Sequence, residues 1–201
     1  MALNFANNSS LANITALPSS ISGGAMTLLS EQTASSSATI SFTSGIDSTY
    51  DKYVFKFYDI HPATDDTDLT FQVDTGTNTS YNQTITSTAF QVYHPENDSS
   101  TTLEYKANRD QAQGTAFQSL CQDIGNGNDE SMSGYLEIYN PSSSVFVKHF
   151  IGLGTNVYSG DASIQIYSAG YINTTTPLTR VQFKMDSGNI DSGVIKLYGI
   201  S

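Results

Sequence analysis

Tryptophan and cysteine are the scarcest residues in this sequence. Among 201 residues there is no Trp and a single Cys, Cys121. A lone cysteine forms neither an intrachain disulfide nor a thiolate metal cluster. Its neighbours are not basic, so we expect the Cys121 thiol to be buried and unreactive. Without Trp the chain lacks the strongest aromatic platform for stacking on sugars, although surface Tyr can take that role.

Charge is also scarce, and what there is has one sign. Charged residues make up 13% of the chain, with 8 Lys and Arg against 19 Asp and Glu, for a net charge of −11. An acidic surface repels nucleic-acid phosphates and anionic membranes, so neither is an expected partner. No apolar run approaches the ~20 residues of a membrane span. No basic and apolar leader opens the chain, so we expect synthesis in a cytoplasm.

The residues that are plentiful indicate an all-β protein. Twelve Tyr and ten Phe favour pleated, half-buried surfaces, and the many Ser, Thr, Asn and Gly residues suit turns and strand edges. A chain of this length fits one core. We predict a single antiparallel β-sandwich, jelly-roll-like, over residues 26–201, with at most one short helix.

Alternating apolar and polar residues predict strands at intervals typical of a sandwich. In the first half, Tyr53, Phe55 and Phe57 should share one face of a strand, opposite Val54, Lys56 and Tyr58. The predicted strands are 37–42, 52–60, 68–74, 84–93, 101–106, 135–139, 145–151, 163–172, 180–185 and 193–200. Strands 135–139 and 145–151 should form a hairpin.

Two stretches do not fit this pattern. Residues 1–25 scatter apolar side chains among Asn and Ser without a period, which predicts an extended attachment arm. The arm residues expected to contact a partner are Leu3, Phe5, Leu11, Ile14 and Leu17. Residues 110–124 have helix-like apolar spacing interrupted by Gly114, so this segment is either a short helix or an irregular loop leading into a strand.

No arrangement of residues predicts an enzyme or a cofactor. His61, His94 and His149 have no metal-binding spacing, and no Gly-x-Ser-x-Gly elbow is present. Two oxygen-rich loops, one with Asp65, Asp66 and Asp68 and the other at 123–130, could attract a hard cation. A solvated turn is the commoner reading of such a cluster.

Several tyrosines fall near predicted loops or strand ends, where they suit protein interfaces or glycan contact. Capping of the core is the alternative for each of them. They are Tyr50, Tyr81, Tyr93, Tyr105, Tyr158 and Tyr171.

Long runs of this chain resemble virion structural proteins of tailed phages of marine bacteria, including cyanophages. The resemblance covers nearly the whole chain. The runs are Leu3–Ser10, Leu29–Phe42, Ser44–Tyr50, Ile60–Asp65, Tyr139–Ser144, Lys148–Phe150, Gln182–Met185, Ser187–Gly193 and Lys196–Ile200.

The resemblance implies a structural component of the phage particle. With an arm and an acidic exterior, we expect a subunit on the outside of the virion that binds the major capsid protein, other virion proteins or sister subunits, with a trimer as the candidate homo-oligomer. A head decoration or cement-like role is favoured. The alternative is a tail-associated or tail-fibre receptor-binding module that contacts host-surface glycan.

Overall fold

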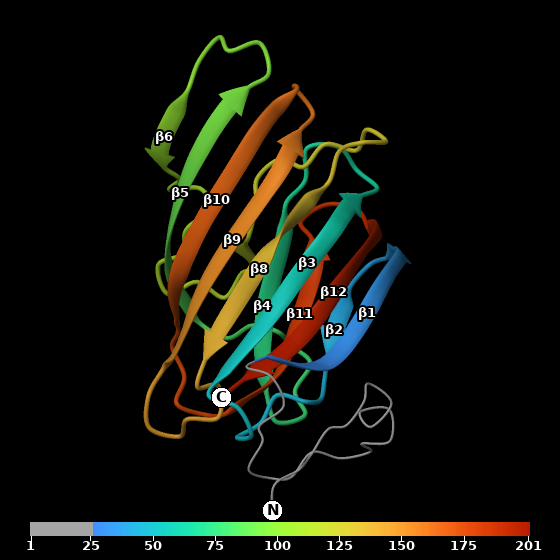
Figure 1. Ribbon diagram of the computed structural model, residues 1–201. Helices are drawn as coiled ribbons and strands as arrows, with labels where there is room; N and C mark the ends of the chain where they lie inside the picture. Colours follow the sequence, from blue (N-terminus) through green and yellow to red (C-terminus); the bar gives the residue numbers. More distant parts are fainter. Residues whose placement is uncertain (1–25) are drawn as a thin grey trace, which may run out of the picture.

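The protein is an all-β sandwich, seen in a computed structural model that describes residues 26–201 (Figure 1). The predicted arm and its five contact residues lie outside the described residues. No helix occurs in the described part of the chain. The strands are β1 Thr27–Ser37, β2 Ile40–Phe42, β3 Lys52–Pro62, β4 Leu69–Thr75, β5 Ile85–Pro95, β6 Thr102–Tyr105, β7 Gln118–Ser119, β8 Met132–Tyr139, β9 Lys148–Tyr158, β10 Ala162–Ile172, β11 Leu178–Met185 and β12 Ile190–Ile200.

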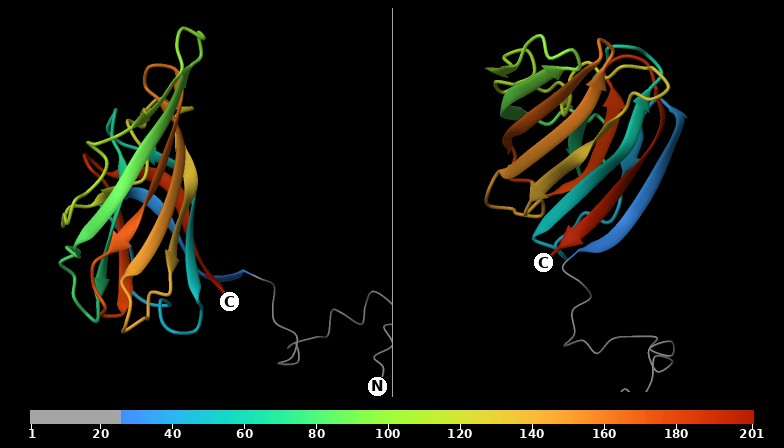
Figure 2. Two further views of the ribbon diagram at one scale, coloured as in Figure 1. Left: turned by 90° about the vertical axis from the view of Figure 1, so that its left-hand side faces the viewer. Right: turned by 45° about the horizontal axis from the view of Figure 1, so that its top comes forward.

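The strands form two antiparallel sheets that pack face to face, as the view along the edges shows (Figure 2). The smaller sheet has the order β2-β11-β4-β7, and the larger begins β1-β12-β3-β8. In chain order the strands of these two sets alternate between the sheets, except that β4 and β7 both lie in the smaller sheet, and this is the arrangement of a jelly roll. The larger sheet then continues through β9, β10, β5 and β6. These four strands are an extension beyond the jelly-roll core.

Aromatic rings fill the space between the two sheets. Phe183 of β11 lies at the centre, with ring centroids 5.1 Å from Phe55 and 5.3 Å from Phe57 on β3. Phe42 of β2 contacts the same ring edge-on at 6.2 Å. Tyr53, Phe55 and Phe57 are all buried, so the predicted inward face of this strand is confirmed. Such edge-to-face contacts add to the stabilisation that burial provides.

The predicted strand over 37–42 is wrong as a single element. Ser37 ends β1 in the larger sheet, and Ile40 begins β2 in the smaller one. The residue Ser36, at φ 47°, precedes the change of sheet. Ala38 is therefore exposed and does not share the buried face of Ile40 and Phe42. Strand β1 itself was missed, because its polar sequence reflects an edge position with little burial.

Residues 110–124 adopt the irregular alternative and contain the short strand β7. Gly114 exchanges backbone hydrogen bonds with Ile85, and Leu120 donates its N–H to the carbonyl of Leu69 at 2.9 Å. Tertiary partners thus satisfy backbone groups that a helix would have paired internally, and local helix propensity is overridden. This segment runs beside the free edge of the first half of β5. The predicted 135–139 and 145–151 hairpin is confirmed, although its second strand begins only at Lys148.

Candidate functional site

A row of outward-facing side chains crosses all eight strands of the larger sheet. Directly opposed residues in antiparallel strands share a face, so the pairing registers place these side chains side by side. The row is Glu31, Lys196, Lys56, Tyr135, Leu153, Tyr167, Phe90 and Tyr105. It is charged over β1, β12 and β3 and becomes aromatic and apolar over β8 and the extension. The two halves of one sheet face therefore differ in chemistry.

The end of this row at β5 and β6 leaves large apolar side chains in solvent. Phe90 is 42% exposed, and its ring stacks on Tyr167 at 5.2 Å. Leu103 and Tyr105 of β6 are 72% and 56% exposed, and Val92 beside them is 41% exposed. Contiguous exposed apolar side chains mark interaction surfaces in soluble proteins. We call Phe90, Val92, Leu103 and Tyr105 the β5–β6 patch.

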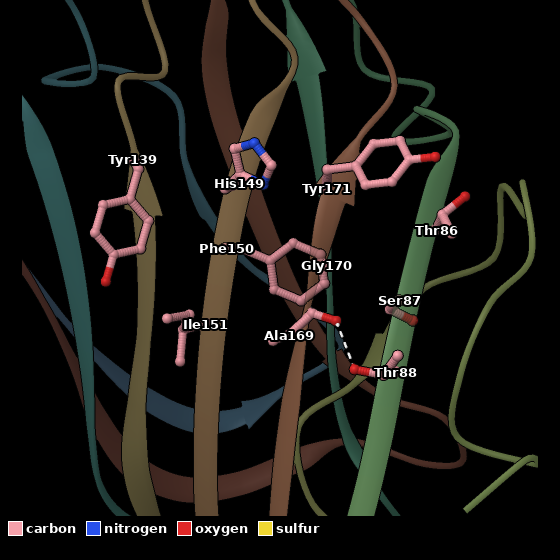
Figure 3. Close-up of a pocket in the computed structure, with 10 residues that line it drawn as sticks. All are labelled: Thr86, Ser87, Thr88, Tyr139, His149, Phe150, Ile151, Ala169, Gly170 and Tyr171. Carbon is pink, nitrogen blue, oxygen red and sulfur yellow. Dashed lines mark hydrogen bonds between the residues drawn. The ribbon is translucent and has the colours of Figure 1, made fainter.

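A hollow of about 460 Å³ opens on the same face of the extension (Figure 3). Among the outward side chains of β10, the small Ala169 lies next to the large Tyr171, so it leaves a depression beside that ring. On the neighbouring strands the register places Ile151 and Thr88 beside Ala169. The hollow is therefore a consequence of one small residue in the middle of a bulky surface.

Aromatic side chains form the walls of the hollow. Figure 3 shows the rings of Tyr139 and Tyr171 on two sides of His149, which comes from the strand between them. The rings of His149 and Tyr171 meet edge-on with centroids 6.4 Å apart. Thr86 and Thr88 on β5 supply hydroxyl groups at the remaining side.

Hydrogen bonds hold the Tyr171 wall in place. The side-chain amide of Gln113 donates to the Tyr171 hydroxyl at 3.4 Å and also to the hydroxyl of Thr86. Asn173 Nδ2 donates to Gln113 Oε1 at 2.7 Å. Gln113 belongs to the irregular segment beside β5, so this segment completes the rim of the hollow.

On the opposite side of the hollow, Glu137 and Lys52 hold the Tyr139 ring in place. Its hydroxyl donates to Glu137, and Lys52 Nζ donates to the other carboxylate oxygen of Glu137 at 3.0 Å. Burial and the hydrogen bond to Glu137 raise the pKa of Tyr139 to about 12. Tyr139 therefore stays a neutral phenol at physiological pH.

The histidines and loop tyrosines that the sequence singled out are spread over the molecule. His149 and Tyr171 meet in the hollow, and Tyr105 belongs to the β5–β6 patch. His61 lies 3.1 Å from the Gly127 carbonyl, and His94 lies 3.1 Å from Asp98. Within residues 26–201, no hydrogen bond joins a histidine to a Ser or Cys side chain. Sequence reasoning missed Tyr139, Thr86 and Gln113, because the registers of β8, β9, β10 and β5 bring the first two together and the fold of the irregular segment adds Gln113.

The two oxygen-rich loops are adjacent, but their carboxylates point at different groups. Asp65 accepts a hydrogen bond from the Asn126 N–H at 3.1 Å, and Asp66 accepts one from Ser159. Asp68 is buried and accepts from the Asp123 N–H at 2.9 Å. In the described residues, no three His, Cys, Asp or Glu side chains are grouped so that they could hold a metal ion.

Asp68 instead forms an ion pair with Arg109. Their side chains are 3% and 19% exposed, and Ser119 donates to the same carboxylate at 2.9 Å. Burial raises the pKa of Asp68 to about 6, even though the hydrogen bonds and Arg109 oppose that shift. This cluster joins the residue before β4 to the irregular segment that carries both β7 and Gln113.

Comparison with known proteins identifies no relative. No family model, no curated protein and no solved structure matches this chain. Across residues 26–201, no helix has the length and hydropathy needed to cross a membrane.

Proposed function

We propose that this chain is a non-enzymatic structural protein of a phage virion, most simply an exterior decoration or cement-like subunit. In this proposal it is made in the host bacterial cytoplasm and binds the major capsid protein, another virion protein or a sister subunit. The observation that carries the proposal is the β5–β6 patch. The resemblance of the sequence to phage virion proteins supports the choice of particle.

The composition of the patch suits a protein partner. Protein interfaces are enriched in Tyr and Phe and depleted of charge at their centre, and the patch has two aromatic and two aliphatic side chains with no charge. It lies on strands added outside the jelly-roll core, so it can be covered without disturbing the core. The acidic remainder of the surface keeps the free subunit soluble.

Co-sedimentation with empty shells of the phage that encodes the chain tests this proposal. The double variant Leu103→Ser, Tyr105→Ser should reduce shell binding by about tenfold or more, because truncation at an interface centre removes most of its contact energy. The matched control is Val145→Ser, Phe146→Ser. These two residues are 69% and 70% exposed in the β8–β9 loop, away from the patch, and their replacement should leave binding unchanged.

A second variant examines the attachment arm predicted from the sequence. Removal of residues 1–25 should weaken shell binding if the arm contacts the shell. If the patch variant and the shortened chain both bind shells as strongly as the wild type, the decoration proposal is wrong. Light scattering of the free protein would establish whether it forms a trimer or another oligomer.

The alternative is a tail-associated receptor-binding module that contacts host-surface glycan. The aromatic hollow beside Ala169 favours it. Adsorption of the purified protein to host cells separates the two functions, because a decoration subunit should bind shells and a receptor-binding module should bind cells.

A further inference from the structure

We propose that the hollow beside Ala169 on the outer face of β9, β10 and β5 binds a neutral saccharide. The proposal concerns this site alone and holds for a protein placed on the head or on the tail. It rests on the shape of the hollow, the chemistry of its lining, the hydrogen bonds that fix its walls, and its lack of charge.

The shape suits a small ligand. A volume of about 460 Å³ lies within the range of 300–1,000 Å³ typical of small-molecule sites. The hollow lies on the outer face of the sheet, so a sugar unit can enter while the rest of an oligosaccharide continues outside. The floor is Ala169 with Ile151 beside it.

The lining combines the two kinds of group that a sugar ring needs. A pyranose presents apolar C–H groups on its faces and hydroxyl groups around its edge. The rings of Tyr139, His149 and Tyr171 offer flat apolar surface with polar tips, and Thr86 and Thr88 offer hydroxyl groups at the rim. Ligand sites in general combine a small number of convergent polar groups with a mainly apolar lining.

The walls are already held in one arrangement. Tyr171 accepts a hydrogen bond from Gln113, and its own O–H remains able to donate to a ligand. Thr88 donates to the Ala169 carbonyl at 3.4 Å, which leaves its oxygen able to accept. Tyr139 is fixed through Glu137. Side chains that are ordered before binding lose little conformational entropy on binding.

Charge and backbone pairing narrow the ligand to a neutral saccharide. None of the lining residues in the described structure is Asp, Glu, Lys or Arg. The nearby Lys52 and Glu137 are 3.0 Å apart and neutralise one another, so an anionic ligand has no unpaired cation to meet. A peptide could not add as an extra strand here, because β9 and β10 are paired on both sides.

A glycan array of neutral oligosaccharides built from hexose and N-acetylhexosamine units, followed by calorimetry with the best binder, tests the proposal. The variant Ala169→Leu fills the floor without removing a hydrogen bond, and Tyr171→Ala removes one wall. Each should weaken binding by about tenfold or more. The control Gln165→Leu places the same side chain on the same strand and face but outside the hollow, and should bind like the wild type.

Four results would overturn the proposal. The first is that no neutral oligosaccharide binds at about 10 mM, a concentration high enough to detect weak sites. The second is binding of acidic glycans alone, and the third is wild-type affinity in Ala169→Leu. The fourth is loss of shell binding in Ala169→Leu without any sugar binding, which would assign the hollow to a protein interface. Thermal melts of the three variants show whether each is folded. Since shell binding is tested through Leu103 and Tyr105, either proposal can fail without the other.

Discussion

Arg109 forms an ion pair with the buried carboxylate of Asp68: Nε lies 2.7 Å from Oδ2 without hydrogen-bond geometry, and Nη2 donates a hydrogen bond to Oδ1 at 3.4 Å. The same guanidinium reaches Asp123 at 3.3 Å. Asp68 directly precedes β4, and Arg109 directly precedes the irregular segment 110–124, which contains β7. One carboxylate thus fastens this segment, including the rim residue Gln113, to the sandwich.

Replacement of Arg109 by Ala should destabilise the protein. It leaves the buried Asp68 carboxylate without its cation, which costs about 3–5 kcal/mol for a fully buried pair. Since the Arg109 side chain is 19% exposed, we expect a loss of about 2 kcal/mol, smaller than that range because water screens the pair. Urea unfolding measures it. The more exposed pair of Lys196 and Glu31, with side chains 30% and 44% exposed, is the control, and Lys196→Ala should shift the midpoint little. An equal shift in both variants would contradict the role given to Arg109.

The raised pKa of Asp68 predicts a specific pH dependence of stability. Its folded pKa of about 6 is above the unfolded value near 3.9, so the folded state binds the proton more tightly. Protonated Asp68 adds to the free energy of unfolding below about pH 4, and this stabilisation is lost as pH rises through about 6. In Asp68→Asn this decrease in the free energy of unfolding should be absent when unfolding is measured at a series of pH values between about 4 and 7. Identical pH profiles for wild type and variant would show that Asp68 titrates normally.

Phe183 should be the most sensitive position of the core. Its ring contacts Phe42, Phe55 and Phe57, so Phe183→Ala leaves a cavity among them and should cost about 3–5 kcal/mol. The matched control is Phe146→Ala, where the ring is 70% exposed. Chemical denaturation of both variants gives the comparison. A small effect at Phe183 would mean that the two sheets can close over the cavity.

Cys121 should resist thiol reagents in the folded protein. The residue is buried, and burial together with the charge of Asp68 raises the pKa of its thiol. The thiolate is the reactive form, so labelling with a chromogenic disulfide should be slow in buffer and complete in denaturant. Rapid labelling of the folded protein would indicate that the β7 segment opens readily.

Much of the fold follows from the order of residues along the chain. Alternation in Tyr53, Phe55 and Phe57 specifies a buried strand face, because successive side chains of a strand point to opposite sides. The same rule located most of the long strands. It could not locate β1, where an edge position needs no apolar alternation, and it offered two readings for residues 110–124.

The candidate site was less accessible to sequence reasoning. Tyr171 and His149 were noticed only as one tyrosine near a strand end and one isolated histidine. Their proximity to Tyr139 and Thr86 depends on the registers of β8, β9, β10 and β5, and a shift of one residue would turn each side chain to the other face.

The sequence by itself therefore determined the class of this protein: an acidic, all-β chain with one core, because composition and alternation act locally and survive any arrangement of strands. Only the tertiary structure decided that four strands extend the larger sheet, that aromatic side chains line up across it, and that the small Ala169 lies at the bottom of a hollow beside Tyr171. These features come from pairing between residues distant in the chain, and nothing in local sequence specifies which strand lies beside which.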